Sequence, residues 1–163
     1  MDIPILATEQ NPKGLGASVP ELTNSLSSLP GQLNMGVFSK SLFSMITPEV
    51  HDAIYKRSPG VRSIVLFGIE SHVCVLQTAL DLLEKGYDVH VLADGVSSCN
   101  KEEVPFALER MRQAGAQITT SESISFQLMV DSASPNFKAL ANIIKEEKLF
   151  TKNTLQTLLP TRN

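Results

Sequence analysis

Cys74 is the residue of this sequence best placed to do chemistry. An apolar run from Ile64 to Phe67 predicts a buried strand, and a helical pattern with apolar residues every three to four positions follows it. Cys74 falls within the first turn or so of that helix, just past the carboxyl end of the strand, where open α/β sheets hold their functional groups. The positive end of a helix dipole favours a thiolate over a thiol. The pattern therefore predicts a nucleophilic cysteine.

The alternative is that Cys74 is a packing residue, since unpaired cysteine is often buried and behaves as a small hydrophobe. Position alone does not decide between the two interpretations. The preceding residues Glu70, Ser71 and His72 are polar, at a turn where simple packing would accept almost any residue type. They favour the nucleophile. Cys99 follows the end of a predicted strand and could approach the same edge of the sheet, but no helix start is evident there, and we interpret it as a bystander.

The elements that must position Cys74 alternate along the chain. Strand, helix and strand joined by short connections predict parallel pairing, so we expect an α/β fold with one doubly wound, mostly parallel sheet and helices on both faces. The segments from Asn11 to Gly31 are rich in Gly, Pro and Ser and are predicted to be loops. The predicted strands are Ile3–Ala7, Ile64–Phe67, Asp88–Ala93 and Ala116–Thr120, and the predicted helices include Pro48–Arg57, Glu102–Ala114, Ser121–Val130 and Pro135–Glu147.

Several of the predicted helices have recognisable ends. Thr47 before Pro48 is a typical N-cap followed by proline at the first helical position. Gly86 and Gly115 stand where left-handed caps would end the helices before them. Asp94, at the end of a predicted strand, is interpreted as fixing a turn or capping a helix.

Composition excludes several classes of function. The 163 residues are enough for one domain with a real core, and a net charge of -3 gives no electrostatic footprint for nucleic acid or an anionic membrane. No apolar run approaches the ~20 residues of a membrane span. Two cysteines make no disulfide framework, and the N-terminus resembles neither a secretory signal nor a mitochondrial leader. We expect a cytoplasmic protein, and the sequence leaves a mitochondrial or nuclear location open.

Metal chemistry is not expected. The three histidines, His51, His72 and His90, fall on a helix, a turn and a strand, and they lack ligand spacing. His72 could instead tune Cys74, two residues away. No cofactor is implied.

The motif GIESHVC at the predicted strand-to-helix turn resembles the isochorismatase-like cysteine hydrolases, a Rossmann-like three-layer family. The resemblance continues through TALDLLEKGYDVHVLADGVSS and ALERMRQAGAQITTSES, and it covers nearly the whole chain up to Glu147. It is closest to the isochorismatase-domain-containing subgroup, whose members carry similar TEQ, PEL and FSM segments in the same order. Here these segments begin at Thr8, Pro20 and Phe43.

The resemblance implies roles for particular residues. Cys74 would be the nucleophile, and Lys40 would lie beside the thiolate and stabilise its charge. A cis peptide between Ile69 and Glu70 would turn the amides of Glu70 and Cys74 toward a common point and form an oxyanion hole. Without the resemblance, Lys40 would be interpreted as a solvated charge. The implied activity is metal-independent hydrolysis of a small amide or related acyl compound.

The sequence departs from the family at its beginning. The family's catalytic aspartate ends a first strand that has no counterpart here, and Asp2 precedes a strand rather than ending one. We therefore expect an isochorismatase-like domain over residues 1–150 that lacks its first βα unit, as in a shortened isoform or an incomplete gene model, followed by a tail over 151–163. Loss of that central strand would leave the strands on either side of it with unpaired edges.

These observations leave two functions open. The full-length form would be a hydrolase acting on a small-molecule substrate, and this chain would be inactive without the aspartate. The alternative is a non-catalytic binding or regulatory protein that keeps the fold and has a protein partner. Family members often assemble through helices like Glu102–Ala114, so a homo-oligomer is expected.

Overall fold

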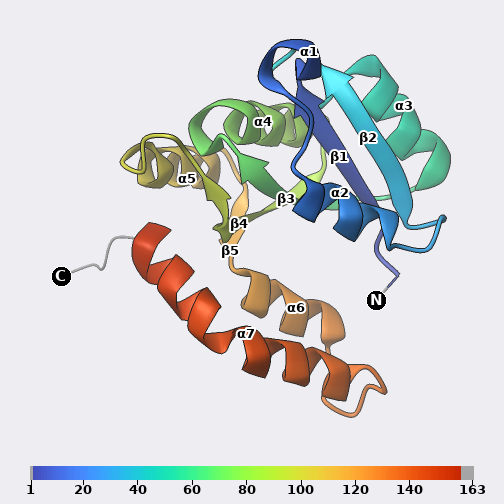
Figure 1. Cartoon of the computed structure of the whole chain (residues 1–163), viewed down its shortest axis with the longest axis vertical. Helices are drawn as coiled ribbons and strands as arrows, with labels where there is room; N and C mark the ends of the chain where they lie inside the picture. Colours follow the sequence, from blue (N-terminus) through green and yellow to red (C-terminus); the bar gives the residue numbers. More distant parts are fainter. Residues whose placement is uncertain (1, 159–163) are drawn as a thin grey trace. The chain divides into compact units, whose positions relative to one another are not determined.

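The computed structural model describes residues 2–158, which form two compact units (Figure 1). The N-terminal unit contains residues 2–62, and the C-terminal unit begins at residue 63. Each unit is described by itself. In both, every strand pairing is parallel and helices flank the strands, so the predicted α/β class is confirmed.

The N-terminal unit is built on two strands. Strand β1 pairs in parallel with β2 from Leu6 opposite Gly36 to Gln10 opposite Lys40. Helices α2 and α3 pack against β2, and Val50 of α3 is 1% exposed. Both strands end at the same edge, where the polar residues of this unit gather. The elements are β1 (Ile5–Gln10), α1 (Pro12–Leu15), α2 (Pro20–Ser27), β2 (Asn34–Lys40) and α3 (Pro48–Arg57).

The C-terminal unit has a three-stranded sheet in the order β3-β4-β5. Helices α4 and α5 pack on each other and on β4, and α6 and α7 also contact β4. The central strand therefore has helices packed against it along much of its length. The elements are β3 (Ser63–Ile69), a π-helical turn (Ser71–Val75), α4 (Leu76–Glu84), β4 (Asp88–Ser97), α5 (Glu103–Gln113), β5 (Gln117–Thr119), α6 (Ser121–Met129) and α7 (Phe137–Leu158).

The core of the C-terminal unit forms between β4 and its helices. Val89 and Val91 of β4 alternate with less buried residues, as expected for one face of a strand. Leu82 of α4 and Met111 of α5 are both at most 1% exposed. This packing holds the start of α4, and the turn before it, on the sheet.

Several sequence-based expectations are confirmed in detail. Helix α3 has the predicted bounds, and the Thr47 side chain accepts a hydrogen bond from the Val50 amide at 3.3 Å. Gly86 and Gly115 follow their helices with φ of 82° and 112°, in the left-handed region that favours glycine. Asp94 caps α6, accepting from the amide and the hydroxyl of Ser121 at 2.8 and 2.5 Å.

The prediction of loops between Asn11 and Gly31 was wrong, because that segment contains α1 and α2. Pro20 lies in the first turn of α2, and the hydroxyls of Ser25 and Ser27 donate to carbonyls one turn earlier. Neither helix buries a residue, so the apolar periodicity that signals a helix is missing. Strand β2 was not predicted, since its sequence includes glycine, asparagine and serine.

Two other boundaries differ from expectation. Helix α7 continues to Leu158 where the prediction ended it at Glu147, so much of the expected tail is helical; residues 159–163 lie outside the described residues. Instead of one sheet there are two, of two and three strands. Strands β1 and β3 each have a single strand neighbour among residues 2–158.

Candidate active site

Cys74 lies in a π-helical turn that joins β3 to α4. Strand β3 ends at Ile69, and the Ile69–Glu70 peptide bond, for which the resemblance implies the cis form, is cis. In the turn, the Val75 amide donates to the carbonyl of Glu70, five residues earlier, at 3.1 Å. The α-helix α4 begins two residues after the cysteine, at Leu76, so Cys74, predicted within the first turn or so of the helix, lies in a π-helical turn that leads into α4. Such wide turns recur at functional sites.

Residues that follow Cys74 restrain the backbone of the turn. Thr78, which is 1% exposed, donates its hydroxyl to the Cys74 carbonyl oxygen at 2.6 Å. Val75 is 3% exposed and packs the turn into the core. The Cys74 side chain is half-buried. Its backbone is therefore fixed while part of its side chain reaches solvent.

The loop that follows β4 contacts the same turn through Ser98. The Ser98 hydroxyl accepts from the Ser71 amide at 3.2 Å and lies 2.5 Å from the Ser71 hydroxyl. It also lies 2.9 Å from Nδ1 of His72. Ser71 is fully buried, so this network supplies the hydrogen bonds that a buried hydroxyl requires.

Cys99, the next residue, contacts the carboxylate of Glu70. Its amide donates to Oε1 and its thiol to Oε2, both at 3.2 Å, and Nδ1 of His72 lies 3.8 Å from Oε2. The hydrogen bond to the carboxylate raises the pKa of the exposed Cys99 thiol above its ordinary value. The structure thus places Cys99 against a predicted site residue. No sequence signal indicated this contact, because the two residues are 29 positions apart.

Lys40 ends β2 in the N-terminal unit and is 7% exposed, so the interpretation as a solvated charge is wrong. Its ammonium donates to Oε1 of Gln10 at 2.6 Å and to the carbonyls of Leu42 and Phe43, both at 2.9 Å. Burial of a lysine requires such partners. These bonds hold the loop after β2 against the end of β1.

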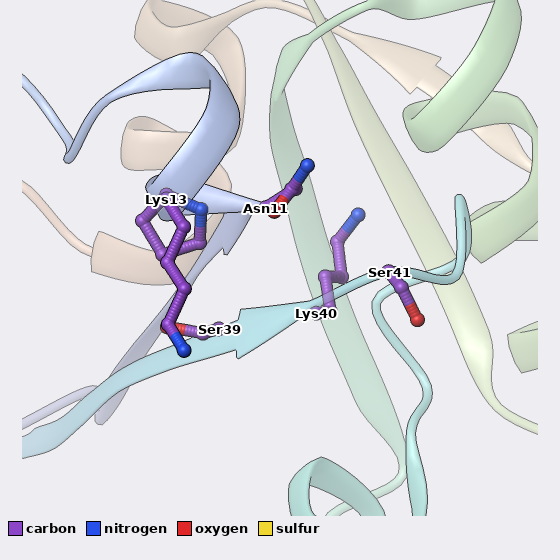
Figure 2. Close-up of a pocket in the computed structure, with 6 residues that line it drawn as sticks. Asn11, Lys13, Ser39, Lys40 and Ser41 are labelled. Carbon is purple, nitrogen blue, oxygen red and sulfur yellow. The ribbon is translucent and has the colours of Figure 1, made fainter.

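An open pocket of about 290 Å³ adjoins Lys40 (Figure 2). Figure 2 shows that Lys13 of α1 and Lys40 of β2 both line it. The other lining residues lie at or just after the ends of β1 and β2. The lining residues are Asn11, Pro12, Lys13, Ser39, Lys40 and Ser41.

Glu9, beside this pocket, belongs to the TEQ segment singled out in the sequence. Its carboxylate accepts from the amide and the hydroxyl of Ser18 at 3.1 and 3.3 Å and from the Ser39 hydroxyl at 3.1 Å. The hydrogen bond from the Ser18 amide is the main reason that the pKa of Glu9 lies below its ordinary value. Glu9 therefore fixes the loop after α1.

The predicted site residues belong to both units. Ile69 ends β3 and Glu70 and Cys74 follow it in the C-terminal unit, and Lys40 ends β2 in the N-terminal unit. Within residues 2–158, His, Cys, Asp and Glu form no group of three arranged to hold a metal ion. No helix in the same part of the chain has the length and apolar character of a membrane span.

Parallel strands flanked by helices, with Cys74 in the turn after β3, define the chain as an α/β protein. Residues 1–123 match the Isochorismatase domain, and the chain belongs to this family. It is 49% identical over 146 residues to isochorismatase domain-containing protein 2 of Xenopus laevis, an alignment that covers 90% of this chain and 67% of the frog protein.

Two further relatives agree with this assignment. Isochorismatase domain-containing protein 1 of Danio rerio is 48% identical, with 89% of this chain and 48% of the fish protein covered, so the chain spans about half the length of that relative. A solved structure described as MAR1 ribonuclease from Caenorhabditis elegans superposes with a TM-score of 0.76 at 44% identity, covering 88% of this chain and 70% of that one. The resemblance recognised in the sequence is confirmed.

Proposed function

We propose that this chain carries the nucleophile of a metal-independent cysteine hydrolase whose substrate is a small amide or related acyl compound. The observation that supports it best is the position of Cys74 in the π-helical turn that directly follows β3. A thiol held there lies next to backbone amides at the end of a strand, where acyl-transfer sites need both a nucleophile and hydrogen-bond donors.

The proposed reaction has two steps. The Cys74 thiolate attacks the substrate carbonyl, and the amides of Glu70 and Cys74 donate to the oxyanion that forms. The carbon–heteroatom bond then breaks, a thioester remains on Cys74, and the leaving group takes the proton that the thiol gave up. Water attacks the thioester, which releases the carboxylic acid and restores the thiol.

Lys40 is proposed to favour the thiolate by its positive charge. Its ammonium is buried and held by Gln10 and two carbonyls, so its position is fixed before any substrate binds. A buried charge acts more strongly on its surroundings than one in solvent. In this proposal Lys40 acts through charge and does not transfer a proton.

The aspartate that the resemblance assigns as general base has no counterpart in the printed sequence. We propose that the residues of the printed sequence suffice to form the thioester slowly. The whole protein's hydrolase activity would then need a group that these residues do not supply. The alternative is a binding or regulatory protein that uses the same turn without chemistry.

The test uses p-nitrophenyl acetate, an activated acyl ester, with the whole chain. We expect release of p-nitrophenolate with one acetyl group on Cys74, located by peptide mass mapping. Cys99→Ala keeps the adduct and Cys74→Ala lacks it. Equal acylation of the wild type and Cys74→Ala, or an adduct on Cys99 alone, would overturn the hydrolase proposal and favour the binding function.

A homo-oligomer and a cytoplasmic location complete the proposal. Phe106 on α5 is 73% exposed, and an aromatic side chain this exposed on a helix is typical of a surface that a partner covers. Sedimentation of the wild type and of Phe106→Lys tests the assembly. If a species larger than the monomer persists unchanged in the variant, α5 is excluded as the contact. The net charge of -3 gives no support for nucleic acid as the substrate.

A further inference from the structure

The loop after β4 contacts the turn before Cys74 at two successive residues. Ser98 binds the amide of Ser71 and lies beside its hydroxyl, and Cys99 binds both carboxylate oxygens of Glu70. These contacts join segments 27 to 29 residues apart and hold the first two residues after the cis peptide. We name residues 98–99 the Ser98–Cys99 loop.

The contact between Cys99 and Glu70 restrains the Glu70 side chain at both oxygens of its carboxylate. A carboxylate that accepts from an amide and a thiol, each at 3.2 Å, favours the side-chain rotamer that makes both hydrogen bonds. The backbone of the same residue is restrained by the neighbouring Ser71 amide, which donates to Ser98. The orientation of the Glu70 amide therefore depends on the Ser98–Cys99 loop.

We propose that Ser98 and Cys99 are positioning residues that hold the Glu70 amide for the oxyanion formed in the reaction at Cys74. This inference rests on the proposed function and assigns to it two residues outside the nucleophilic turn. Preorganised donors must keep their geometry to within about 0.5 Å, and hydrogen bonds from neighbouring residues provide that rigidity. Cys99, which sequence reasoning treats as a bystander, thereby acts through Glu70.

The protonation state of Cys99 agrees with this role. The thiol donates only when it carries its proton, and the neighbouring carboxylate raises its pKa, so the donor form persists at neutral pH. The same interaction makes an exposed thiol a poor nucleophile. Cys99 is thus suited to positioning and unsuited to replacing Cys74.

Two reactions of Cys74 separate positioning from general disruption. Acylation by p-nitrophenyl acetate passes through an oxyanion, whereas alkylation by iodoacetamide is a displacement at carbon that forms none. Loss of an oxyanion donor typically lowers a rate about 10²-fold, and a misplaced donor should cost less, about tenfold. We therefore compare both rates for Cys74, by peptide mass mapping, in the wild type and in Cys99 and Ser98 variants.

Cys99→Ala is expected to slow acylation about tenfold and to leave alkylation unchanged. Ser98→Ala should act in the same direction, since it removes the acceptor of the Ser71 amide. Cys99→Ser is the matched control, because its hydroxyl can still donate to Glu70, and it should restore the acylation rate.

Each other outcome overturns a stated part of the reasoning. If wild-type Cys74 is not acylated, the proposed function fails and the inference fails with it. If Cys74 is acylated at the same rate in the wild type, Cys99→Ala and Ser98→Ala, the inference alone fails. Equal losses of both reactions, or no rescue by Cys99→Ser, would show a structural effect and also reject positioning. Circular dichroism of each variant checks that the fold is retained.

Discussion

Truncation of Leu82 tests whether the packing of α4 on the sheet supports the turn that carries Cys74. Leu82 is 1% exposed, and Leu82→Ala removes three carbon atoms from the core. At ~0.8 kcal/mol per buried methylene group the transfer cost alone is about 2.4 kcal/mol. The unfilled cavity raises the expected loss in free energy of unfolding to about 3 kcal/mol.

The assay is urea unfolding followed by circular dichroism at 222 nm. With a slope of about 2 kcal/mol per molar urea, the expected loss lowers the midpoint by roughly 1.5 M. Leu149→Ala is the matched control, since it makes the same chemical change on α7 at a residue that is 69% exposed, and it should move the midpoint little. Equal shifts for the two variants would refute the assignment of Leu82 to the core.

Three further predictions concern single side chains. Thr47→Ala removes the acceptor of the Val50 amide and should lower the free energy of unfolding by about 1 kcal/mol, whereas Thr47→Ser should not; urea midpoints measure both. Asp94→Asn keeps one acceptor for Ser121 but loses the negative charge at the N-terminus of α6, and the same assay should show a loss of about 0.5–1 kcal/mol. The pKa of Glu9 is lower in the folded than in the unfolded chain, so its contribution to stability is present above its unfolded pKa and disappears as pH falls through its folded pKa. Glu9→Gln should therefore destabilise the protein at pH 7 and have little effect near pH 2, and a pH-independent effect would contradict the assignment.

The fold class could be predicted because the C-terminal unit follows simple rules. Strands β3 and β4 contain apolar runs, and glycines end the helices that follow them. The apolar pattern and the helix-ending residues therefore indicate the same elements. Helix α3 was predicted to its exact bounds because Thr47 and Pro48 signal its start. The N-terminal unit was harder, since α2 buries no residue and β2 buries only Met35 and Lys40. Elements with so little burial leave no apolar periodicity in the sequence.

The residues of the candidate site also differ in how far the sequence could predict them. Cys74 could be identified from local sequence, because a strand, a turn and a helix follow one another there. Lys40 depended on the resemblance, since a lysine in a serine-rich segment has no distinctive pattern, and its burial is visible only in three dimensions. Cys99 could be placed after a strand end, but its contact with Glu70 could not be predicted, because it depends on side-chain positions where β3 and β4 lie side by side.

Among residues 2–158, β1 and β3 each pair with one strand. This affects how the protein behaves at high concentration. The side of a strand that has no neighbour offers amides and carbonyls at the spacing that another extended chain needs. Strand β3 (SIVLFGI) contains neither proline nor a charged residue, the two features that commonly block such pairing, and β1 (ILATEQ) has only Glu9. Backbone hydrogen bonding is insensitive to ionic strength compared with charge repulsion. Association through these strands joins separate molecules, so it should increase with protein concentration.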